Sequence, residues 1–295
     1  MLKIVGYNSL DELIEKTVPS KILFKSSLKL KPGMNEEFNK INMQLLSIKN
    51  NFFKTYIGVG YYGTITPSVI LRNILENPGW YTAYTPYQPE VSQGRLEMLM
   101  NFQQMIIDLT GMEIANASLL DESTAAAEAM MLAYKQTGKK KKTFCVQNSC
   151  HPQTFSVLQT RAEPLGIKII NSSKPNEDTF ACLLQNPDTY GEIKDLKSII
   201  NLNKKDNIIS IVISDLMSLV LMKSPGELGA DIVVGSAQRF GVPMGLGGPH
   251  AAFFATRDDF KRLMPGRIIG VSVDINNKRA YRMALQTREQ HIRRE

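Results

Sequence analysis

Residues 84–90 form a short segment that combines a stiff backbone with polar side-chain tips. Two prolines restrict the chain there, and Tyr84 and Tyr87 offer rigid rings that carry hydroxyl groups. Glu90 adds a carboxylate just before the start of a predicted helix. Together these groups could donate and accept hydrogen bonds around a reacting molecule. A packed, capped connector between two helices is the alternative interpretation.

Two further residues stand where strands of an α/β sheet are expected to end. Asp215 follows the apolar run 208–214, so its carboxylate is expected at the carboxyl end of a parallel strand, where α/β proteins bind ligands. It could instead be the N-cap of a helix that begins at Leu216. His151 occupies the loop after a strand that ends near Val146. Because a single histidine is often structural, this position alone does not indicate catalysis.

The helix that is expected to begin after Asp121 is a poor phosphate site. Helix N-termini attract anions through their free N–H groups and their dipole. Here Asp121 and Glu122 occupy the first turn. Two like charges roughly 5 Å apart, at an effective dielectric constant of about 20, repel each other by about 3 kcal/mol before screening. We therefore expect no phosphate at residues 121–127.

Metal and nucleotide sites are not expected. The cysteines Cys145, Cys150 and Cys182 are not spaced as metal ligands, and their number and spacing indicate a reducing compartment. His250 and His291 have no partners at metal-ligand spacing. The glycine run at 245–248 lacks the Lys-Ser/Thr pair of a phosphate-binding loop.

Charge and hydropathy argue against nucleic acid and membrane partners. The net charge of +7 is modest for 295 residues, and its densest run, 139–142, is typical of a solvated helix terminus. A bilayer span needs about 20 mostly apolar residues, and the longest apolar stretch is interrupted by polar side chains. The first residues do not resemble a targeting segment.

The pattern of apolar runs predicts the scaffold that must position these side chains. Short continuous apolar runs separated by helical patterns indicate a mainly parallel sheet covered on both faces, which is a three-layer α/β fold. The predicted strands are 143–146, 167–171, 181–184, 208–214, 232–234 and 251–255. The predicted helices of this part are 92–110, 122–137, 152–163 and 193–202.

Residues 1–50 are predicted to form a helical N-terminal arm. A capping box from Ser9 to Glu12 opens one helix, and an apolar stripe predicts a second over 35–48. We expect the remaining residues, 51–295, to form one large domain.

The two ends of that domain carry their own predictions. Near its start, Thr66 is expected to cap a helix whose first residue is Pro67. At the other end, residues 276–295 are strongly polar and include no apolar closing element. They are either a frayed tail or the point at which a longer domain has been cut.

Several motifs, spread over nearly the whole chain, together resemble the glycine cleavage system P-protein family. They are YIG at 56–58 with GYY at 60–62, YTPYQPEVSQGRLE at 84–97, ANASLLDE at 115–122, HPQT at 151–154, QRFGVP at 238–243, GGPHAAFF at 247–254 and QTREQHIRR at 286–294. Chance does not explain so many runs in one chain.

The resemblance implies a fold-type I, aminotransferase-like large domain. It also implies an enzyme that decarboxylates glycine through pyridoxal phosphate and passes the aminomethyl group to the lipoyl arm of the H-protein. In this family two such halves pair, either fused or as separate subunits. The chain resembles the N-terminal half only and ends before the small domain of that half, so the resemblance implies a truncated sequence.

The resemblance also assigns the cofactor to the other half. Pyridoxal phosphate requires a lysine for its Schiff base, a carboxylate beside its pyridine nitrogen and an anion site. Gln238 falls at the lysine position, and neither its amide nor the guanidinium of Arg239 is a usable nucleophile. We therefore expect no catalytic residue and no covalent cofactor in this chain. Asp215 would be a remnant of the pyridinium partner.

In that interpretation Tyr84, Tyr87, Glu90 and His151 could complete the active site of the other half in trans. The implied partners are the lysine-bearing half, the lipoylated H-protein and glycine, in a homodimer or heterotetramer. The implied location is the mitochondrial matrix in a eukaryote or the cytoplasm in a bacterium.

Two alternatives stay open. The first is a non-catalytic regulatory or interaction subunit of the same fold, which the reading frame after residue 295 would distinguish from part of an enzyme. The second is a decarboxylase that uses another lysine, such as Lys223.

Overall fold

A computed structural model describes residues 1–26, 28–51, 53–82, 85–172, 174–244 and 250–284. The chain divides into two compact units, residues 1–54 and 55–295. The smaller unit contains α1 (Leu10–Thr17) and α2 (Glu36–Ser47). Ser9 caps α1 by accepting the N–H of Glu12, and Asn35 caps α2 by accepting the N–H of Phe38. Both predicted helices are therefore confirmed.

The larger unit is built on a seven-stranded sheet with the order β1-β7-β6-β5-β4-β2-β3. Strands β3, β2, β4, β5 and β6 run parallel, whereas β7 is antiparallel to both β6 and β1. The strands are β1 (Ile114–Ala115), β2 (Thr143–Val146), β3 (Lys168–Asn171), β4 (Thr179–Asn186), β5 (Ile209–Ser214), β6 (Ile232–Ser236) and β7 (Ala252–Thr256). The six predicted strands are confirmed, and β1 was not predicted.

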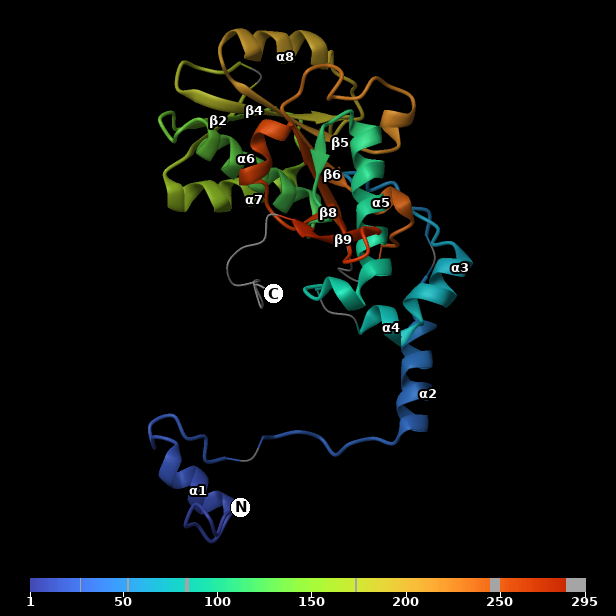
Figure 1. Ribbon diagram of the computed structural model, residues 1–295, viewed down its shortest axis with the longest axis vertical. Helices are drawn as coiled ribbons and strands as arrows, with labels where there is room; N and C mark the ends of the chain where they lie inside the picture. The colour runs from blue at the N-terminus through green and yellow to red at the C-terminus, as the bar shows by residue number, and fades with distance from the viewer. Residues whose placement is uncertain (27, 52, 83–84, 173, 245–249, 285–295) are drawn as a thin grey trace. The chain divides into compact units, whose positions relative to one another are not determined.

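Helices cover both faces of this sheet, which confirms the three-layer α/β class (Figure 1). One face packs on α6 (Glu122–Gln136) and α7 (Pro152–Ala162). The other packs on α5 (Gln93–Thr110) and α8 (Leu196–Lys205). Strands β2, β4, β6 and β7 are buried along their whole length, which explains why their sequences are continuously apolar rather than alternating.

Two helix starts differ from the prediction. Pro67 lies at the N-cap of α3 (Ser68–Ile70) rather than inside it, and Thr66 does not cap this helix because its hydroxyl donates to the carbonyl of Gly241 at 2.7 Å. The helix predicted at 193–202 begins three residues later, because Asp195 accepts the N–H of Ser198 as its N-cap.

A hairpin, β8 (Ile268–Val273) and β9 (Arg279–Ala284), was not predicted, and for residues 279–284 it contradicts the frayed-tail alternative. Two glutamines of α5 bind it. The side-chain amide of Gln93 pairs with the main-chain N–H and carbonyl of Tyr281, at 2.8 and 2.9 Å, and Gln103 pairs with Ile269 in the same way, at 2.8 and 3.1 Å. Part of the polar end is therefore an ordered strand, and residues 285–295 lie outside the described residues.

The remaining elements are short helical turns. They are η1 (Leu71–Leu75), α4 (Pro78–Tyr81), η2 (Pro89–Val91), η3 (Glu163–Leu165), η4 (Ser218–Val220), η5 (Gln238–Phe240) and η6 (Asp258–Leu263). Within the described part of the chain, no helix has both the length and the apolar character that a membrane crossing requires.

Candidate functional site

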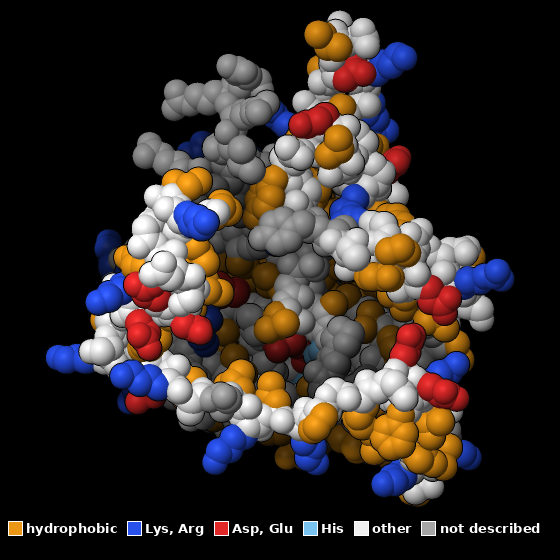
Figure 2. Space-filling model, turned by 90° about the horizontal axis from the view of Figure 1, so that it is seen from below, with side chains coloured by type: hydrophobic (Ala, Val, Ile, Leu, Met, Phe, Trp, Pro, Cys, Tyr) orange, Lys and Arg blue, Asp and Glu red, His pale blue; other side chains and the backbone are white. Residues whose placement is uncertain are grey.

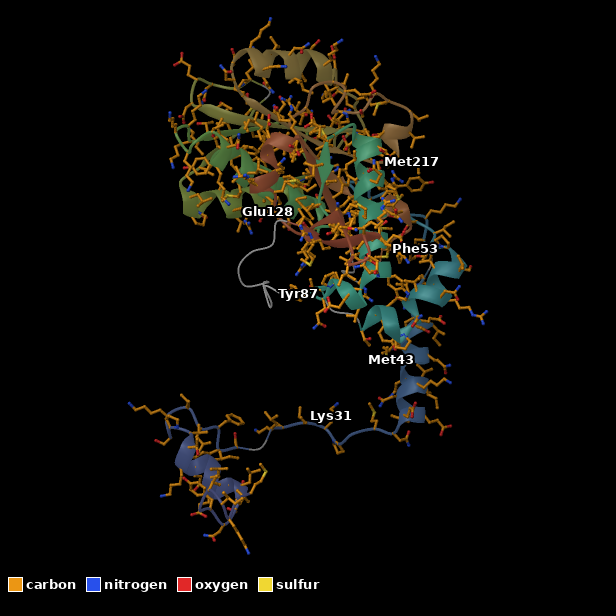
Figure 3. All side chains as sticks on the ribbon, viewed as in Figure 1. Lys31, Met43, Phe53, Tyr87, Glu128 and Met217 are labelled. Carbon is orange, nitrogen blue, oxygen red and sulfur yellow. The ribbon has the colours of Figure 1, made fainter. Side chains whose placement is uncertain are left out.

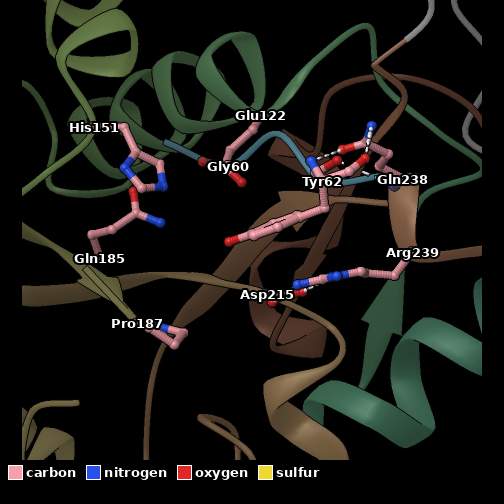
Figure 4. Close-up of a pocket in the computed structure, with 10 residues that line it drawn as sticks. Gly60, Tyr62, Glu122, His151, Gln185, Pro187, Asp215, Gln238 and Arg239 are labelled. Carbon is pink, nitrogen blue, oxygen red and sulfur yellow. Dashed lines mark hydrogen bonds and ion pairs between the residues drawn. The ribbon is translucent and has the colours of Figure 1, made fainter. Parts of the chain in front are cut away.

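A narrow pocket, with a free volume of about 10 Å³, lies where β4, β5 and β6 end and α6 and α7 begin (Figure 4). The carboxyl ends of parallel strands share one edge of a sheet, so side chains that follow them converge there. A loop from the start of the larger unit supplies the remaining wall. The lining residues are Gly60, Tyr62, Glu122, His151, Gln185, Pro187, Asp215, Ser236, Gln238 and Arg239.

Gln238 follows β6 and is 1% exposed. Its amide pairs with the main chain of Tyr62: Nε2 donates to the Tyr62 carbonyl at 3.0 Å, and Oε1 accepts the Tyr62 N–H at 3.3 Å. Both ends of the amide are thus engaged by a residue 176 positions away in the sequence. The residue expected at the lysine position lies in the pocket and holds a loop.

Asp215 and Arg239 form a bidentate ion pair beside Gln238. Arg239 Nε and Nη2 donate to Oδ1 and Oδ2 of Asp215 at 2.9 and 2.7 Å, which raises the pKa of the guanidinium. The guanidinium also lies over the Tyr62 ring, 3.6 Å from its centroid. Burial and the nearby Asp215 carboxylate raise the pKa of Tyr62.

Asp215 is not the N-cap of an α-helix. Its Oδ1 accepts the N–H of Met217 at 3.1 Å in a turn, and the segment that follows contains only the short helix η4. The N-cap expectation is therefore wrong, and both carboxylate oxygens of Asp215 are held by Arg239.

Glu122 is a pocket residue that the sequence analysis considered only as a charge in the first turn of α6. It is 5% exposed, and burial raises its pKa to about 7, with a further contribution from Asp215. Near neutral pH it is therefore about half protonated, so the repulsion of an anion that we predicted from two full charges is overestimated. The alanine-rich sequence that follows Glu122 in α6 was the signal, present in the sequence, that this helix start is buried.

His151 lies at the N-cap of α7 and is buried. Its Nδ1 and the Thr189 hydroxyl are 2.9 Å apart, and burial lowers the pKa of the imidazole. Gly60 covers the ring: a Cβ built on Gly60 would lie 3.4 Å from Cδ2 of His151. The backbone of the 58–66 loop thus lies against the His151 ring.

Other contacts fasten the same loop. Gln153 Nε2 donates to the Val59 carbonyl at 2.6 Å. The ring of His250, for which we predicted no role, stacks on Tyr61 with centroids 4.6 Å apart. The Thr64 hydroxyl donates to the Val242 carbonyl at 2.7 Å. The loop is therefore held along its whole length.

The residues predicted from the 84–90 segment do not line this pocket. Tyr87 is partly buried against Leu96, Ile269 and Met283, at the end of the larger unit away from α8 (Figure 3). Glu90 is exposed in η2, and Tyr84 lies outside the described residues.

The residues present do not fit pyridoxal phosphate, the cofactor that the resemblance implies for the complete enzyme. None of the described lining residues is a lysine, and Lys223 is exposed and lies elsewhere. The carboxylate that could face a pyridine nitrogen is paired, and the one lining cation, Arg239, is committed to it. Among the described residues no group of three or more His, Cys, Asp or Glu side chains is placed to hold a metal ion.

Comparisons with known proteins agree on one family. The model of the glycine cleavage system P-protein family matches residues 1–295. Curated relatives include glycine dehydrogenase (decarboxylating) of Pelagibacter ubique, 59% identical over all of this chain and 31% of the relative, and that of Nostoc sp., 56% identical over all of this chain and 30% of the relative.

A solved structure supports the same grouping. The crystal structure of an inhibitor-bound glycine decarboxylase (P-protein) of the glycine cleavage system matches with a TM-score of 0.89 at 36% identity, over all of this chain and 68% of that one. The chain thus spans about a third of the length of the curated relatives that it matches.

Proposed function

From the premise that the chain belongs to the glycine cleavage system P-protein family, we propose that it forms part of a glycine decarboxylase. The complete enzyme would remove carbon dioxide from glycine and pass the aminomethyl group to the lipoyl arm of the H-protein. Pyridoxal phosphate, when bound, would supply the electron sink for that reaction. In a bacterium this enzyme would work in the cytoplasm, and in a eukaryote in the mitochondrial matrix.

The role that we propose for this chain is that of scaffold and interface, with no covalent cofactor of its own. The observation that supports this role is the Gln238 amide, which is at the position where the resemblance leads us to expect the lysine and which is hydrogen-bonded at both ends to the main chain of Tyr62. A second, lysine-bearing half would then hold the cofactor. We propose that the two halves pair in a homodimer or a heterotetramer.

Exposed apolar side chains support an interface role. Near the pocket loop, Tyr56, Ile57 and Ile65 are 90%, 76% and 89% exposed. Hydrophobic side chains are also frequent among the charged ones on the face shown in Figure 2. Burying such groups against a partner would be favourable by roughly 25 cal/mol per Å² of apolar area. The net charge of +7 would help to attract an acidic partner such as a lipoylated carrier.

The 84–90 segment is proposed to complete the active site of the lysine-bearing half. Tyr87 is supported by the apolar cluster of α5, β8 and β9, while Glu90 is exposed to a partner. Rigid support preserves the position of a hydroxyl or carboxylate that acts on a neighbouring site. His151 would contribute to that site only as part of the wall of its own pocket, because its ring lies against Gly60.

Reconstitution tests this function. The chain alone, with glycine, pyridoxal phosphate and lipoylated H-protein, should release no carbon dioxide from carboxyl-labelled glycine, and borohydride should trap no pyridoxyl group on a single lysine. Adding a separately expressed lysine-bearing half should restore release. A stoichiometric adduct on this chain would contradict the scaffold role. A complex that forms without activity would favour the regulatory subunit.

A further inference from the structure

The pocket at the carboxyl edge of the sheet has a ligand that belongs to the chain itself. We infer that Gln238 and Arg239, the latter held in place by Asp215, bind the 58–66 loop as the permanent occupant of this pocket, with Tyr62 in the central place. This goes beyond the proposed function, because it assigns a ligand and a positioning role to residues for which the reaction has no use. The inference depends only on the geometry of this chain. It can therefore be wrong while the proposed activity is right, and the proposed activity can be wrong while the inference is right.

The first support is the form of the Gln238 contact. A side-chain amide that binds both the N–H and the carbonyl of one residue replaces a neighbouring strand. The chain uses the same device twice more, at Gln93 with Tyr281 and at Gln103 with Ile269, and both of those pairs fasten the β8–β9 hairpin to α5. By this comparison Gln238 is a fastening residue of the same kind.

The second support is the stack beside it. The Tyr62 ring lies on the Arg239 guanidinium, whose two N–H groups are bound to Asp215, so ring, cation and carboxylate form one layered unit (Figure 4). A flat anionic ligand would have to displace the ring and compete with a charge-assisted, two-pronged hydrogen bond. The pocket is therefore complementary to the loop and not to a free cofactor.

The third support comes from the pocket wall opposite that stack. Gly60 has φ +86° and lies so close to His151 and Glu122 that a Cβ there would contact both, at 3.4 and 3.7 Å. Gln153 donates to the Val59 carbonyl of the loop, and the Thr64 and Thr66 hydroxyls of the loop donate to the carbonyls of Val242 and Gly241. The loop thus enters the pocket from Gly58 and leaves it at Thr66 without a free stretch between them.

Fixing this loop has a consequence for the surface next to it. Tyr56 and Ile57 precede the fastened segment and Ile65 lies within it, all three with exposed side chains. Gln238 holds the backbone at Tyr62 and Arg239 holds the Tyr62 ring, so the segment from which these side chains project is fixed between Ile57 and Ile65. Gln238 and Arg239 are positioning residues for that surface.

Hydrogen–deuterium exchange of the 295-residue chain tests the inference. In Gln238→Ala, which loses both hydrogen bonds to Tyr62, amides of the 56–66 peptide should exchange roughly ten- to hundred-fold faster. The matched control is Gln103→Ala, which removes the same kind of pair from Ile269. It should accelerate exchange around residues 268–270 and leave the loop unchanged. If the 56–66 peptide exchanges alike in the unmodified chain and in Gln238→Ala, the inference is wrong.

Two additions keep the test decisive. Should Gln238→Ala not fold, Gln238→Met keeps a side chain of similar length, adds no charge and loses both hydrogen bonds to Tyr62, so the same acceleration confined to the loop is expected. Equilibrium dialysis with free pyridoxal phosphate should show no retention by the unmodified chain. Retention near one molecule per chain, with altered exchange in the loop, would overturn the assignment of the loop as occupant.

Discussion

Arg239 and Asp215 meet through two parallel hydrogen bonds, of 2.9 and 2.7 Å, although 24 residues separate them in the sequence. The meeting follows from the sheet. Asp215 comes directly after β5 and Arg239 shortly after β6, and these strands are parallel neighbours, so both residues emerge at the same edge. The pair also supplies the cation on which Tyr62 stacks. Breaking it should therefore loosen the pocket as well as remove one ion pair.

Replacing Arg239 by Met tests this coupling. The variant leaves Asp215 without its cation and Tyr62 without its stacking partner. The side chains are 22% and 16% exposed, so the cost should fall between that of exposed pairs, up to about 1 kcal/mol, and that of fully buried pairs, about 3 to 5 kcal/mol. We expect a loss of about 2 kcal/mol in the free energy of unfolding, measured by urea denaturation.

The matched control is Arg161→Met, which breaks the pair with Glu128 on the surface of α6 and α7. Those side chains are 46% and 27% exposed, so the loss should stay below about 1 kcal/mol. Equal losses in the two variants would mean that the Arg239 pair has no more structural weight than a surface contact.

Glu122 should make stability depend on pH. Its pKa is about 7 in the folded chain against an ordinary value of 4.5, so the folded state binds this proton more tightly than the unfolded state. Below about pH 4.5 the carboxyl is protonated in both states and does not lower the free energy of unfolding. As the pH rises from 4.5 to about 7, its ionisation lowers the free energy of unfolding progressively. The full cost is about 3 kcal/mol, at about 1.4 kcal/mol per pKa unit.

Glu122→Gln should remove that dependence. Compared with the parent, the variant should gain stability at pH 8 relative to its stability at pH 5, by about 2 to 3 kcal/mol. Urea unfolding of both proteins at the two pH values gives the difference, with pH 5 as the internal reference. An identical pH dependence in parent and variant would show that the Glu122 carboxyl titrates as an ordinary exposed group.

The sequence was sufficient for the parts of the fold that rest on local patterns. Strands such as β5 and β6 have long apolar runs because both of their faces are buried, and α5 ends at Gly111, whose φ is +67°. By contrast, β9 has arginines between its apolar residues, and it is ordered by its pairing with β8 and by the Gln93 amide. Such long-range contacts leave no periodicity in the sequence, so no strand was predicted at residues 276–284.

The pocket divides in the same way. Asp215 was placed correctly at a strand end, because that position follows from the apolar run before it. The partners of the pocket could not be predicted, since Tyr62 reaches Gln238 across 176 positions and Glu122 becomes buried only when α6 packs under the loop. One signal in the sequence was not used. Arg239 stands next to Gln238, so its guanidinium could have been expected at the same edge of the sheet as the Asp215 carboxylate.

Three glycines of the pocket loop give a graded test of its close fit. Gly63 has no left-handed backbone and open space around it, Gly58 has φ +66° with open space, and Gly60 has φ +86° with His151 at 3.4 Å. Alanine at position 63 should leave the free energy of unfolding nearly unchanged. Alanine at position 58 should lower it by about 1 kcal/mol, and alanine at position 60 by about 2 kcal/mol. Thermal unfolding of the three variants measures the order, and a larger loss at Gly58 than at Gly60 would contradict the close contact with His151.

The last prediction concerns the 84–90 segment in an enzyme that also contains the lysine-bearing half. Tyr87→Phe removes one hydroxyl and keeps the ring that packs on Leu96, and Glu90→Gln removes a charge from an exposed position and keeps its shape. Both variants should therefore fold and hold cofactor normally. If the segment completes the active site in trans, glycine decarboxylation should fall by roughly ten- to a thousand-fold, which corresponds to a lost transition-state contact of about 1.5 to 4 kcal/mol.

Two measurements test the prediction: the rate of carbon dioxide release at saturating glycine, and the absorbance of the bound cofactor, which reports how much cofactor each variant holds. Unchanged rates would make the segment a connector only, whereas loss of cofactor together with precipitation would make it a packing element of the interface.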